Sequence, residues 1–484
     1  MKPLRFLLVS LLLCCVLNVS AEIKLPKVIG DNMILQQGKN VAVWGDADPG
    51  ETVTVKFAKQ TVRVKADAEG KWSVALAPME VSKTPREMTV SGKKEKITLK
   101  NILVGEVWLA SGQSNMEYSM NRHPQYKKPA KGDPDILQKE FSAAENPLIR
   151  VLYVEKKLDT AELPTSGWHE AVGEELAPVS AAGYFFAKKL FEELDVPVGI
   201  ISSSWGGTAI ETWTPVEAYL ESPLFADKMK GDRLEGQEVG RRYGKMIEPL
   251  IPYTLKGFIW YQGETSLING DMMNYADKMK VLVDSWRSLW NDNDMPFYYV
   301  QISPMVYSQR RDHVAKDWQS LPHFWEVQTL ALDIPNTGMI VTTDLVDNPR
   351  DIHPSYKWIV GERLSRLALA KDYDKKVEYS GPVFKKMAID GNKAVIEFDH
   401  VESGLVTSDG KAPDWFQISG PDGKFVKAEA AIDGGRVVLT AKGVKEPAAV
   451  RFAWDEVAMP NLVNGEGLPA VPFRTNGEKW SYTK

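Results

Sequence analysis

Between residues 101 and 372 the sequence alternates near-continuous apolar runs with stretches of helical periodicity, and this alternation restricts the fold most strongly. Apolar runs that we interpret as buried strands occupy residues 102–110, 149–154, 196–205, 255–262, 296–303 and 337–344. Helical patterns occupy residues 181–194, 274–290 and 354–370, and the last of these has Pro354 at its first position, where proline is favoured. Strands that alternate with helices predict a parallel sheet covered by helices on both faces.

The segments on either side of this region have the shorter alternation that is typical of half-buried strands. Residues 22–100 alternate apolar and polar side chains between turn signals, and residues 373–484 do so between Asp-Gly turns. A chain of 484 residues also exceeds one ordinary domain. We therefore predict an N-terminal β-sandwich module over 22–100, an α/β domain over 101–372 and a C-terminal β-rich module over 373–484.

The first 21 residues resemble a secretory signal peptide. Lys2 and Arg5 precede an apolar stretch, and small residues precede an expected cleavage after Ala21. Both cysteines of the chain, Cys14 and Cys15, lie in this leader, so the mature protein needs no disulfide. No later apolar run reaches the length of a membrane span. The sequence predicts a protein exported to the periplasm or the medium.

The pentapeptide GQSNM, residues 112–116, directly follows the first apolar run and precedes an expected helix start. Ser114 has two interpretations there. Serine is a favoured helix N-cap, which is a purely structural role. A serine hydroxyl at a helix start can also be a nucleophile, because the free N–H groups and the helix dipole favour negative charge at that point.

Three further segments follow strand ends, where sites in parallel sheets gather. They are residues 202–213 with Gly206 and Gly207, residues 260–266 with Gln262, and residues 351–357 with His353. Each alone fits a turn, a buried amide or a helix cap. Together they supply what acyl transfer needs, namely a hydroxyl, a base and donors for an oxyanion. The conjunction favours an active site.

Other classes of function find less support in the sequence. A net charge of −5 without a basic stripe argues against a nucleic-acid partner. No histidine, cysteine or acidic residues have the spacing of metal ligands, so we expect neither a metal nor another cofactor. A glycosidase would need two facing carboxylates, and no such pair is evident. A non-catalytic glycan-binding protein would leave the four strand-end segments unexplained.

The ordered segments VWLASGQSNMEYSM, SSWGGTAIETW, GFIWYQGETS and DIHPSYK resemble those of SGNH hydrolases. Over nearly the whole mature chain the sequence is similar to bacterial sialate O-acetylesterases. The resemblance implies an SGNH-type three-layer α/β/α domain with flanking β modules and a serine esterase mechanism. By position, it implies Ser114 as nucleophile and His353 as base. It also implies an oxyanion hole made by the N–H groups of Ser114 and Gly207 and the amide of Gln262.

The acid that would orient His353 departs from the pattern of the superfamily. The usual aspartate precedes the histidine by three positions, where this chain has Arg350. Asp351, two positions before, is the first candidate for the acid. Glu264 is a rival acceptor, and a Ser–His dyad with a backbone acceptor is the third alternative.

The resemblance also implies the substrate, O-acetylated sialic acid, whose carboxylate would bind a cation. We expect Arg350 to bind this group and Trp213 to line the sugar site. Acetylxylan or another acetylated plant polysaccharide is the alternative substrate. The sequence does not indicate an oligomeric state.

Overall fold

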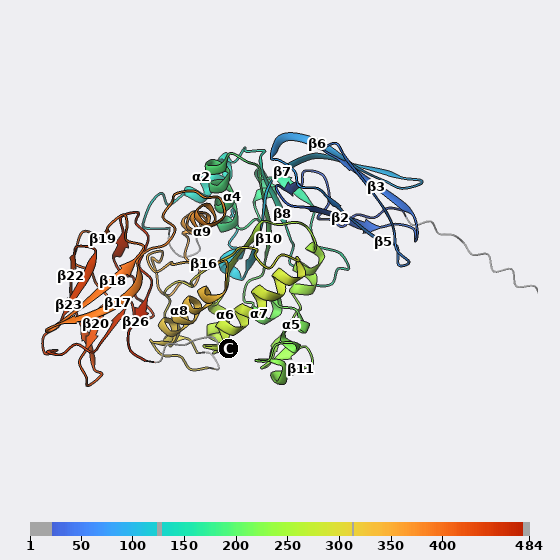
Figure 1. Cartoon of the computed structure of the whole chain (residues 1–484). Coiled ribbons are helices and arrows are strands. Elements are labelled where there is room, and N and C mark those ends of the chain that lie inside the picture. The colour runs from blue at the N-terminus through green and yellow to red at the C-terminus, as the bar shows by residue number, and fades with distance from the viewer. Residues whose placement is uncertain (1–21, 123–127, 312–313, 478–484) are drawn as a thin grey trace, which may run out of the picture.

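The computed structural model describes residues 22–122, 128–311 and 314–477 (Figure 1). The predicted signal peptide, residues 1–21, lies outside the described residues. None of the helices in the described part of the chain has the length and apolar character needed to cross a membrane.

A central sheet, with strand order β16-β15-β14-β7-β10-β8-β9, organises the middle of the chain. Its strands are β7 (Lys96–Gly112), β8 (Ile149–Tyr153), β9 (Trp168–Glu170), β10 (Val198–Ser204), β14 (Gly257–Tyr261), β15 (Phe297–Val300) and β16 (Thr337–Ile340). Neighbouring strands are parallel except for β9, which pairs antiparallel with β8. The predicted parallel sheet is confirmed.

Helices cover both faces of this sheet, as the alternation of the sequence predicts. They are α1 (Ser114–Glu117), α2 (Ile136–Ala143), α3 (Gly173–Leu176), α4 (Ala181–Leu194), α5 (Val216–Leu220), α6 (Glu264–Ile268), α7 (Asn274–Leu289), α8 (Ser320–Leu330) and α9 (Lys357–Asp372). In Figure 1, α4 and α9 lie together on one side of the sheet, with α7 and α8 on the other.

Large aromatic side chains fill the space between the sheet and its two helical layers. On one face, the rings of Trp108 in β7 and Phe186 in α4 have centroids 5.0 Å apart. On the other face, Trp286 of α7 packs against Phe258 at 5.2 Å and against Trp260 at 5.9 Å. Burial of aromatic area on both faces is a major contribution to the stability of this core.

The N-terminal module shares a strand with the central sheet. Its strands are β1 (Ile34–Gln36), β2 (Val41–Asp46), β3 (Thr52–Phe57), β4 (Gln60–Lys65), β5 (Lys71–Leu76) and β6 (Ser82–Ser91). The first part of β7 pairs with β6, and its last part, from Glu106, pairs with β10 and β14. The predicted boundary between residues 100 and 101 therefore falls inside a continuous strand.

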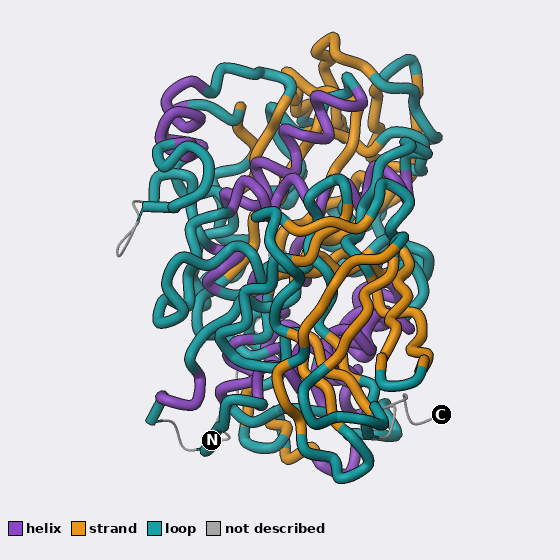
Figure 2. The backbone as a smooth tube through the Cα atoms, turned by 90° about the vertical axis from the view of Figure 1, so that its left-hand side faces the viewer, coloured by secondary structure: helices purple, strands orange, loops and turns teal. Residues whose placement is uncertain are grey.

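The C-terminal module has a hydrophobic core of its own. Its strands are β17 (Val383–Asp390), β18 (Lys393–Asp399), β19 (Leu405–Thr407), β20 (Phe416–Ser419), β21 (Phe425–Lys427), β22 (Glu429–Asp433), β23 (Arg436–Thr440), β24 (Ala449–Phe452), β25 (Leu462–Asn464) and β26 (Phe473–Arg474). Buried Phe398, Phe452 and Phe473 contribute to its core. Figure 2 looks onto this module, whose strands lie in front of the helices of the central domain.

One helix starts later than the sequence predicts, and one small sheet was not predicted. The last helix, expected from Pro354, begins at Lys357, and residues 354–356 belong to a loop. A small antiparallel sheet of β11 (Met229–Lys230), β12 (Arg233–Leu234) and β13 (Gln237–Glu238) follows α5.

Candidate active site

The carboxyl ends of β10, β7 and β14 lie side by side, so the segments that follow them begin at one edge of the sheet. In the register, Gly112 pairs with both Ser204 and Tyr261. Beyond the strands, the N–H of Gln113 donates to the carbonyl of Tyr261 at 3.0 Å. The N–H of Trp205 donates to the carbonyl of Gly112 at 3.1 Å. The sheet therefore brings three of the four predicted segments together.

Gly112 allows the turn that places Ser114 at this edge. Its φ of +138° is unfavourable for residues with side chains, and a Cβ at this position would collide with the carbonyl oxygen of Tyr261. Gln113 is the N-cap of the one-turn helix α1, and Ser114 is the first helical residue. The alternative that Ser114 is the N-cap is therefore wrong.

The Ser114 hydroxyl contacts the histidine from the fourth segment. Ser114 Oγ and His353 Nε2 are 2.8 Å apart, although 239 positions separate the two residues in the sequence. Both side chains are half-buried. A neutral imidazole at this distance can accept the hydroxyl proton while the oxygen attacks an ester.

The surroundings of His353 favour its neutral form. Burial, together with the positive charges of Arg122 and Lys357, lowers the pKa of the imidazole from 6.5 to about 4, and burial is the largest of these causes. The protonated ring would be poorly hydrated and close to two cations. His353 is consequently available as a base at neutral and mildly acidic pH.

Two backbone N–H groups are free to stabilise an oxyanion. In the described part of the chain, neither the N–H of Ser114 nor that of Gly207 donates a hydrogen bond. Gly207 is exposed and has a φ of +71°, a left-handed conformation that favours glycine. The N–H of neighbouring Gly206, by contrast, donates to the Glu117 carboxylate. Of the two glycines, Gly207 is the one with a donor to offer a ligand.

Gln262 has a different position from the one predicted. Its side chain is fully buried, and its Nε2 lies 3.3 Å from the carbonyl oxygen of Thr208 and 3.1 Å from Ser266 Oγ. Both N–H groups of the amide are thus used inside the protein. Gln262 therefore stabilises the loop directly after Gly207 and has no free N–H group for an oxyanion. The predicted role of its amide in the oxyanion hole is wrong.

Neither predicted carboxylate accepts a hydrogen bond from the His353 ring. Asp351 Oδ1 accepts from the backbone N–H of His353 at 2.9 Å, so it stabilises the turn. The Glu264 carboxylate accepts from the side-chain amide of Asn115. Across the described ranges, Nδ1 of His353 has no hydrogen-bond acceptor, whether carboxylate or carbonyl. The geometry therefore matches none of the three alternatives for orienting the ring.

The two predicted substrate-binding residues have opposite environments. Trp213 is fully buried, and its Nε1 donates to Thr208 Oγ1 at 2.9 Å, so it supports the glycine loop and cannot contact a sugar. The expectation that it lines the sugar site is wrong. Arg350 is exposed beside the histidine segment, where it remains accessible.

The sequence analysis assigned no role to four residues at this site: Asn115, Glu117, Arg122 and Lys357. Asn115 and Glu117 lie inside the motif that contains Ser114, and Lys357 lies four positions after His353. Their closeness in the sequence to Ser114 and His353 was the available signal. Their partners lie elsewhere in the chain, and only the structure identifies them.

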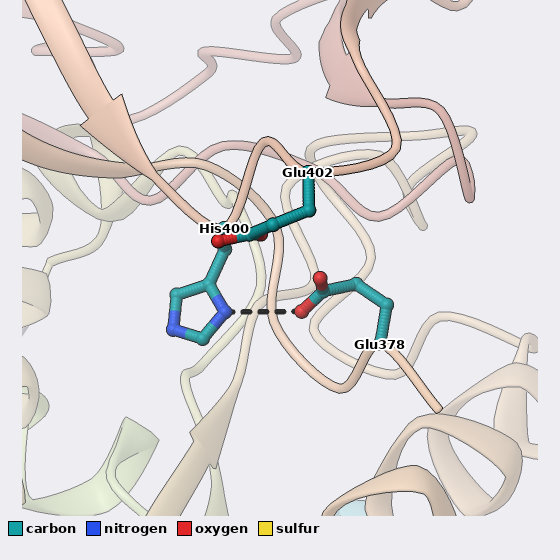
Figure 3. Close-up of side chains that lie close together, drawn as sticks. All are labelled: Glu378, His400 and Glu402. Atoms are coloured by element: carbon teal, nitrogen blue, oxygen red, sulfur yellow. Dashed lines mark hydrogen bonds and ion pairs between the residues drawn. The ribbon is translucent and has the colours of Figure 1, made fainter. Parts of the chain in front are cut away.

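One cluster of metal-ligating side chains lies apart from these strand ends. Glu378, His400 and Glu402 have ligand atoms within 4.8 Å of one another (Figure 3). His400 Nδ1 is 3.0 Å from Glu378 Oε1, which also accepts from the N–H of Tyr379 at 3.2 Å. The cluster lies where the chain enters the C-terminal module, and it adds no group to the Ser114 site.

Comparison with known proteins agrees with a site for ester hydrolysis. Residues 104–369 match the family described as carbohydrate esterase, sialic acid-specific acetylesterase. A sialate O-acetylesterase of Pongo abelii is 28% identical, and the alignment covers 92% of this chain and 91% of the relative. A sialate O-acetylesterase of Homo sapiens is 29% identical over 77% of this chain and 76% of its own.

A solved structure extends the similarity to the whole architecture. The carbohydrate acetylesterase of Xanthomonas citri superposes with a TM-score of 0.83 at 34% sequence identity, covering 94% of this chain and 100% of that one. Fold and family together define an enzyme, a carboxylic ester hydrolase of the carbohydrate esterase class. The chain belongs to the sialic acid-specific acetylesterase family.

The low pKa of His353 predicts the pH dependence of turnover. The base must be neutral to accept a proton, so activity is present above its pKa and is lost as the pH falls through about 4. We expect kcat/KM for a neutral aryl acetate, measured by acetate release, to reach half of its plateau near pH 4. A half-maximum near 6.5, the ordinary value for histidine, would contradict this assignment.

Asp351→Asn tests whether Asp351 orients the imidazole. The substituted amide keeps an oxygen that can accept from the His353 N–H, so we expect kcat to fall less than about tenfold. An aspartate that holds the ring through Nδ1 would behave differently, because its replacement by asparagine costs about 10⁴-fold in kcat. Steady-state kinetics on the aryl acetate separates the two outcomes.

Proposed function

We propose that this enzyme removes O-acetyl groups from sialic acid by a serine acyl-transfer mechanism. The observation that carries the proposal is the 2.8 Å contact between Ser114 Oγ and His353 Nε2, next to the free N–H groups of Ser114 and Gly207. Membership in the sialic acid-specific acetylesterase family supports the substrate.

The reaction proceeds in two steps. His353 Nε2 accepts the proton of Ser114 as the oxygen attacks the acetyl carbonyl, and the N–H groups of Ser114 and Gly207 donate to the oxyanion. His353 then protonates the departing sugar oxygen, which leaves an acetyl group on Ser114. In the second step the same imidazole deprotonates water, which attacks the acetyl-enzyme. Acetate is released and Ser114 regains its proton.

An unpaired cation beside the site favours an anionic sugar. The guanidinium of Arg122 lies 4.6 Å from the centroid of the Tyr118 ring, and it forms no ion pair with a carboxylate of the described residues. Its charge is close enough to lower the pKa of His353. A bound carboxylate would compensate this charge, as that of sialic acid could.

Arg122 also lines a pocket of about 260 Å³ next to the catalytic segments. Tyr118, Ser355 and Trp358 contribute to its wall, which is mostly apolar. Lys128, the other cation of the wall, forms an ion pair with Asp135 at 2.7 Å. Among the described residues of the wall, Arg122 is consequently the cation without a carboxylate partner, and exposed Arg350 is a second candidate outside the pocket.

Export of the enzyme is part of the proposal. The leader with Lys2 and Arg5 before an apolar stretch, and both cysteines inside it, support secretion to the periplasm or the medium. The mature chain would then begin at Glu22. Determination of the amino-terminal sequence of the secreted protein tests this prediction.

Ser114→Ala tests the mechanism, and two substrates test the specificity. We expect the substitution to lower kcat by about 10⁴-fold or more, because Ser114 provides the only hydroxyl among the described residues that hydrogen-bonds to His353 Nε2. Acetate release by the wild-type enzyme should be faster from O-acetylated sialic acid than from acetylated xylan. Normal turnover by Ser114→Ala would refute the mechanism, whereas a preference for xylan would refute only the sugar.

Arg122→Gln tests the anion site in the pocket. Loss of one charge-assisted hydrogen bond should lower kcat/KM for O-acetylated sialic acid by about 10- to 100-fold at neutral pH. The neutral aryl acetate has no carboxylate, so its kcat/KM should be unchanged. Arg63→Gln, which alters an exposed arginine of β4, is the matched control. An equal effect on both substrates would contradict a role in carboxylate binding.

A further inference from the structure

Three polar side chains form a buried cluster behind the Ser114–His353 pair. Lys357 and Asn115 are completely buried, and Glu264 is 2% exposed. They come from three separate segments: Asn115 follows Ser114 in α1, Glu264 begins α6, and Lys357 begins α9. The mechanism described above uses none of them.

The cluster binds the backbone on both sides of His353. Asn115 Nδ2 donates to the carbonyl of Ile352 at 2.9 Å, and Lys357 Nζ donates to the carbonyl of Pro354 at 2.5 Å. Lys357 Nζ also donates to Asn115 Oδ1 at 2.9 Å. The residues on either side of His353 are therefore connected to Asn115, the residue next to Ser114, directly at Ile352 and through Lys357 at Pro354.

Glu264 completes the cluster from the third segment. Its Oε1 accepts from Asn115 Nδ2, and its Oε2 is buried without a hydrogen-bond partner. This contact holds the Asn115 amide from the side opposite to Lys357. The cluster thus joins the segments that follow β7 and β14 to the histidine segment.

We propose that Asn115 and Lys357, with Glu264 as their anchor, are positioning residues that set the distance between Ser114 Oγ and His353 Nε2. They contact neither the reacting atoms nor the imidazole, but they fix the backbone that carries both. The inference rests on the proposed function of Ser114 and His353. It also explains how His353 is held in place although its Nδ1 has no acceptor in the described part of the chain.

The cost of burying Lys357 supports a functional reason for it. The ammonium forms no ion pair with any described carboxylate, and it lies 5.0 Å and 5.5 Å from the ring centroids of Tyr118 and Tyr261. Burial lowers the pKa of Lys357 to about 7, while the charge of Glu264 acts in the opposite direction. A buried cation without an ion pair is unfavourable for folding, and an apolar side chain would fill the same space at lower cost.

Lys357→Met tests the proposal. Methionine fills the space but cannot donate to Asn115 Oδ1 or to the Pro354 carbonyl. We expect kcat for the aryl acetate to fall by about 10²-fold through misplacement of the reacting pair, with KM changed by less than about threefold. The acid limb of kcat/KM should also move above pH 4, because removal of this cation raises the pKa of His353.

The matched control is Lys371→Met, at the other end of the same helix. Lys371 also donates to a backbone carbonyl, that of Thr337 at 3.0 Å, and lies 5.5 Å from the Tyr379 ring centroid. We expect the control to keep the kcat and the acid limb of the wild type. A purely structural role of Lys357 would lower the melting temperature of its variant while kcat stayed at the value of the wild type, and that result would overturn the proposal.

Two further variants keep the test decisive if Lys357→Met folds poorly. Lys357→Met combined with Glu264→Gln removes both buried charges together, so the double variant should fold while showing the same loss of kcat.

Glu264→Gln alone keeps an oxygen for Asn115 and should lower kcat by less than about tenfold. A loss near 10⁴-fold would instead indicate that Glu264 orients the imidazole directly. Wild-type kcat in the double variant would overturn the proposal, whereas an active Ser114→Ala enzyme would refute the underlying mechanism.

Discussion

The hydrogen bond between Ser114 and His353 imposes a constraint on the whole central domain. Two segments 239 positions apart must meet within 2.8 Å, and neither contains enough local structure to arrange this meeting. Parallel strands solve the problem, because their carboxyl ends share one edge and each can supply one segment. The aromatic layers on both faces of the sheet make that edge rigid, since close-packed interiors change shape only at high cost.

The two flanking modules differ in how they are connected to the central sheet. The N-terminal module contributes to the same hydrophobic core as the central sheet, and β7 runs from one into the other without interruption. Ser114 follows β7 after a single turn, so its position depends on a strand anchored in both. The C-terminal module has a separate core and contacts the domain through polar pairs such as Arg474 with Glu326 at 2.9 Å. Apolar contacts also join the two parts, since Val471 belongs to the core of the central domain.

The sequence allowed the central fold to be predicted because its signals are local. Every residue of β10 is buried, so the strand is visible as an apolar run, and α4 matches its predicted range with Ser180 accepting from the Gly183 N–H as a cap. The module boundary near residue 100 could not be predicted in the same way. The side chains of β7 change from mixed exposure to continuous burial at Ile102, but the backbone continues as one strand, and strand partners are not encoded locally.

The positions of the site residues could be predicted, but not the directions of their hydrogen bonds. The strand ends predicted that the segments of Ser114 and His353 meet, and the structure places the two side chains 2.8 Å apart. Which amide or carboxylate reaches which partner depends on contacts between distant segments, as with Glu264 and Asn115.

The effect of nearby charges on the pKa of His353 also could not be predicted from the sequence. Arg122 and Lys357 follow different catalytic segments in the sequence, yet both charges act on His353. An imidazole close to two cations remains neutral down to low pH, and the same positive charge would attract the anionic sugar that we propose as the substrate.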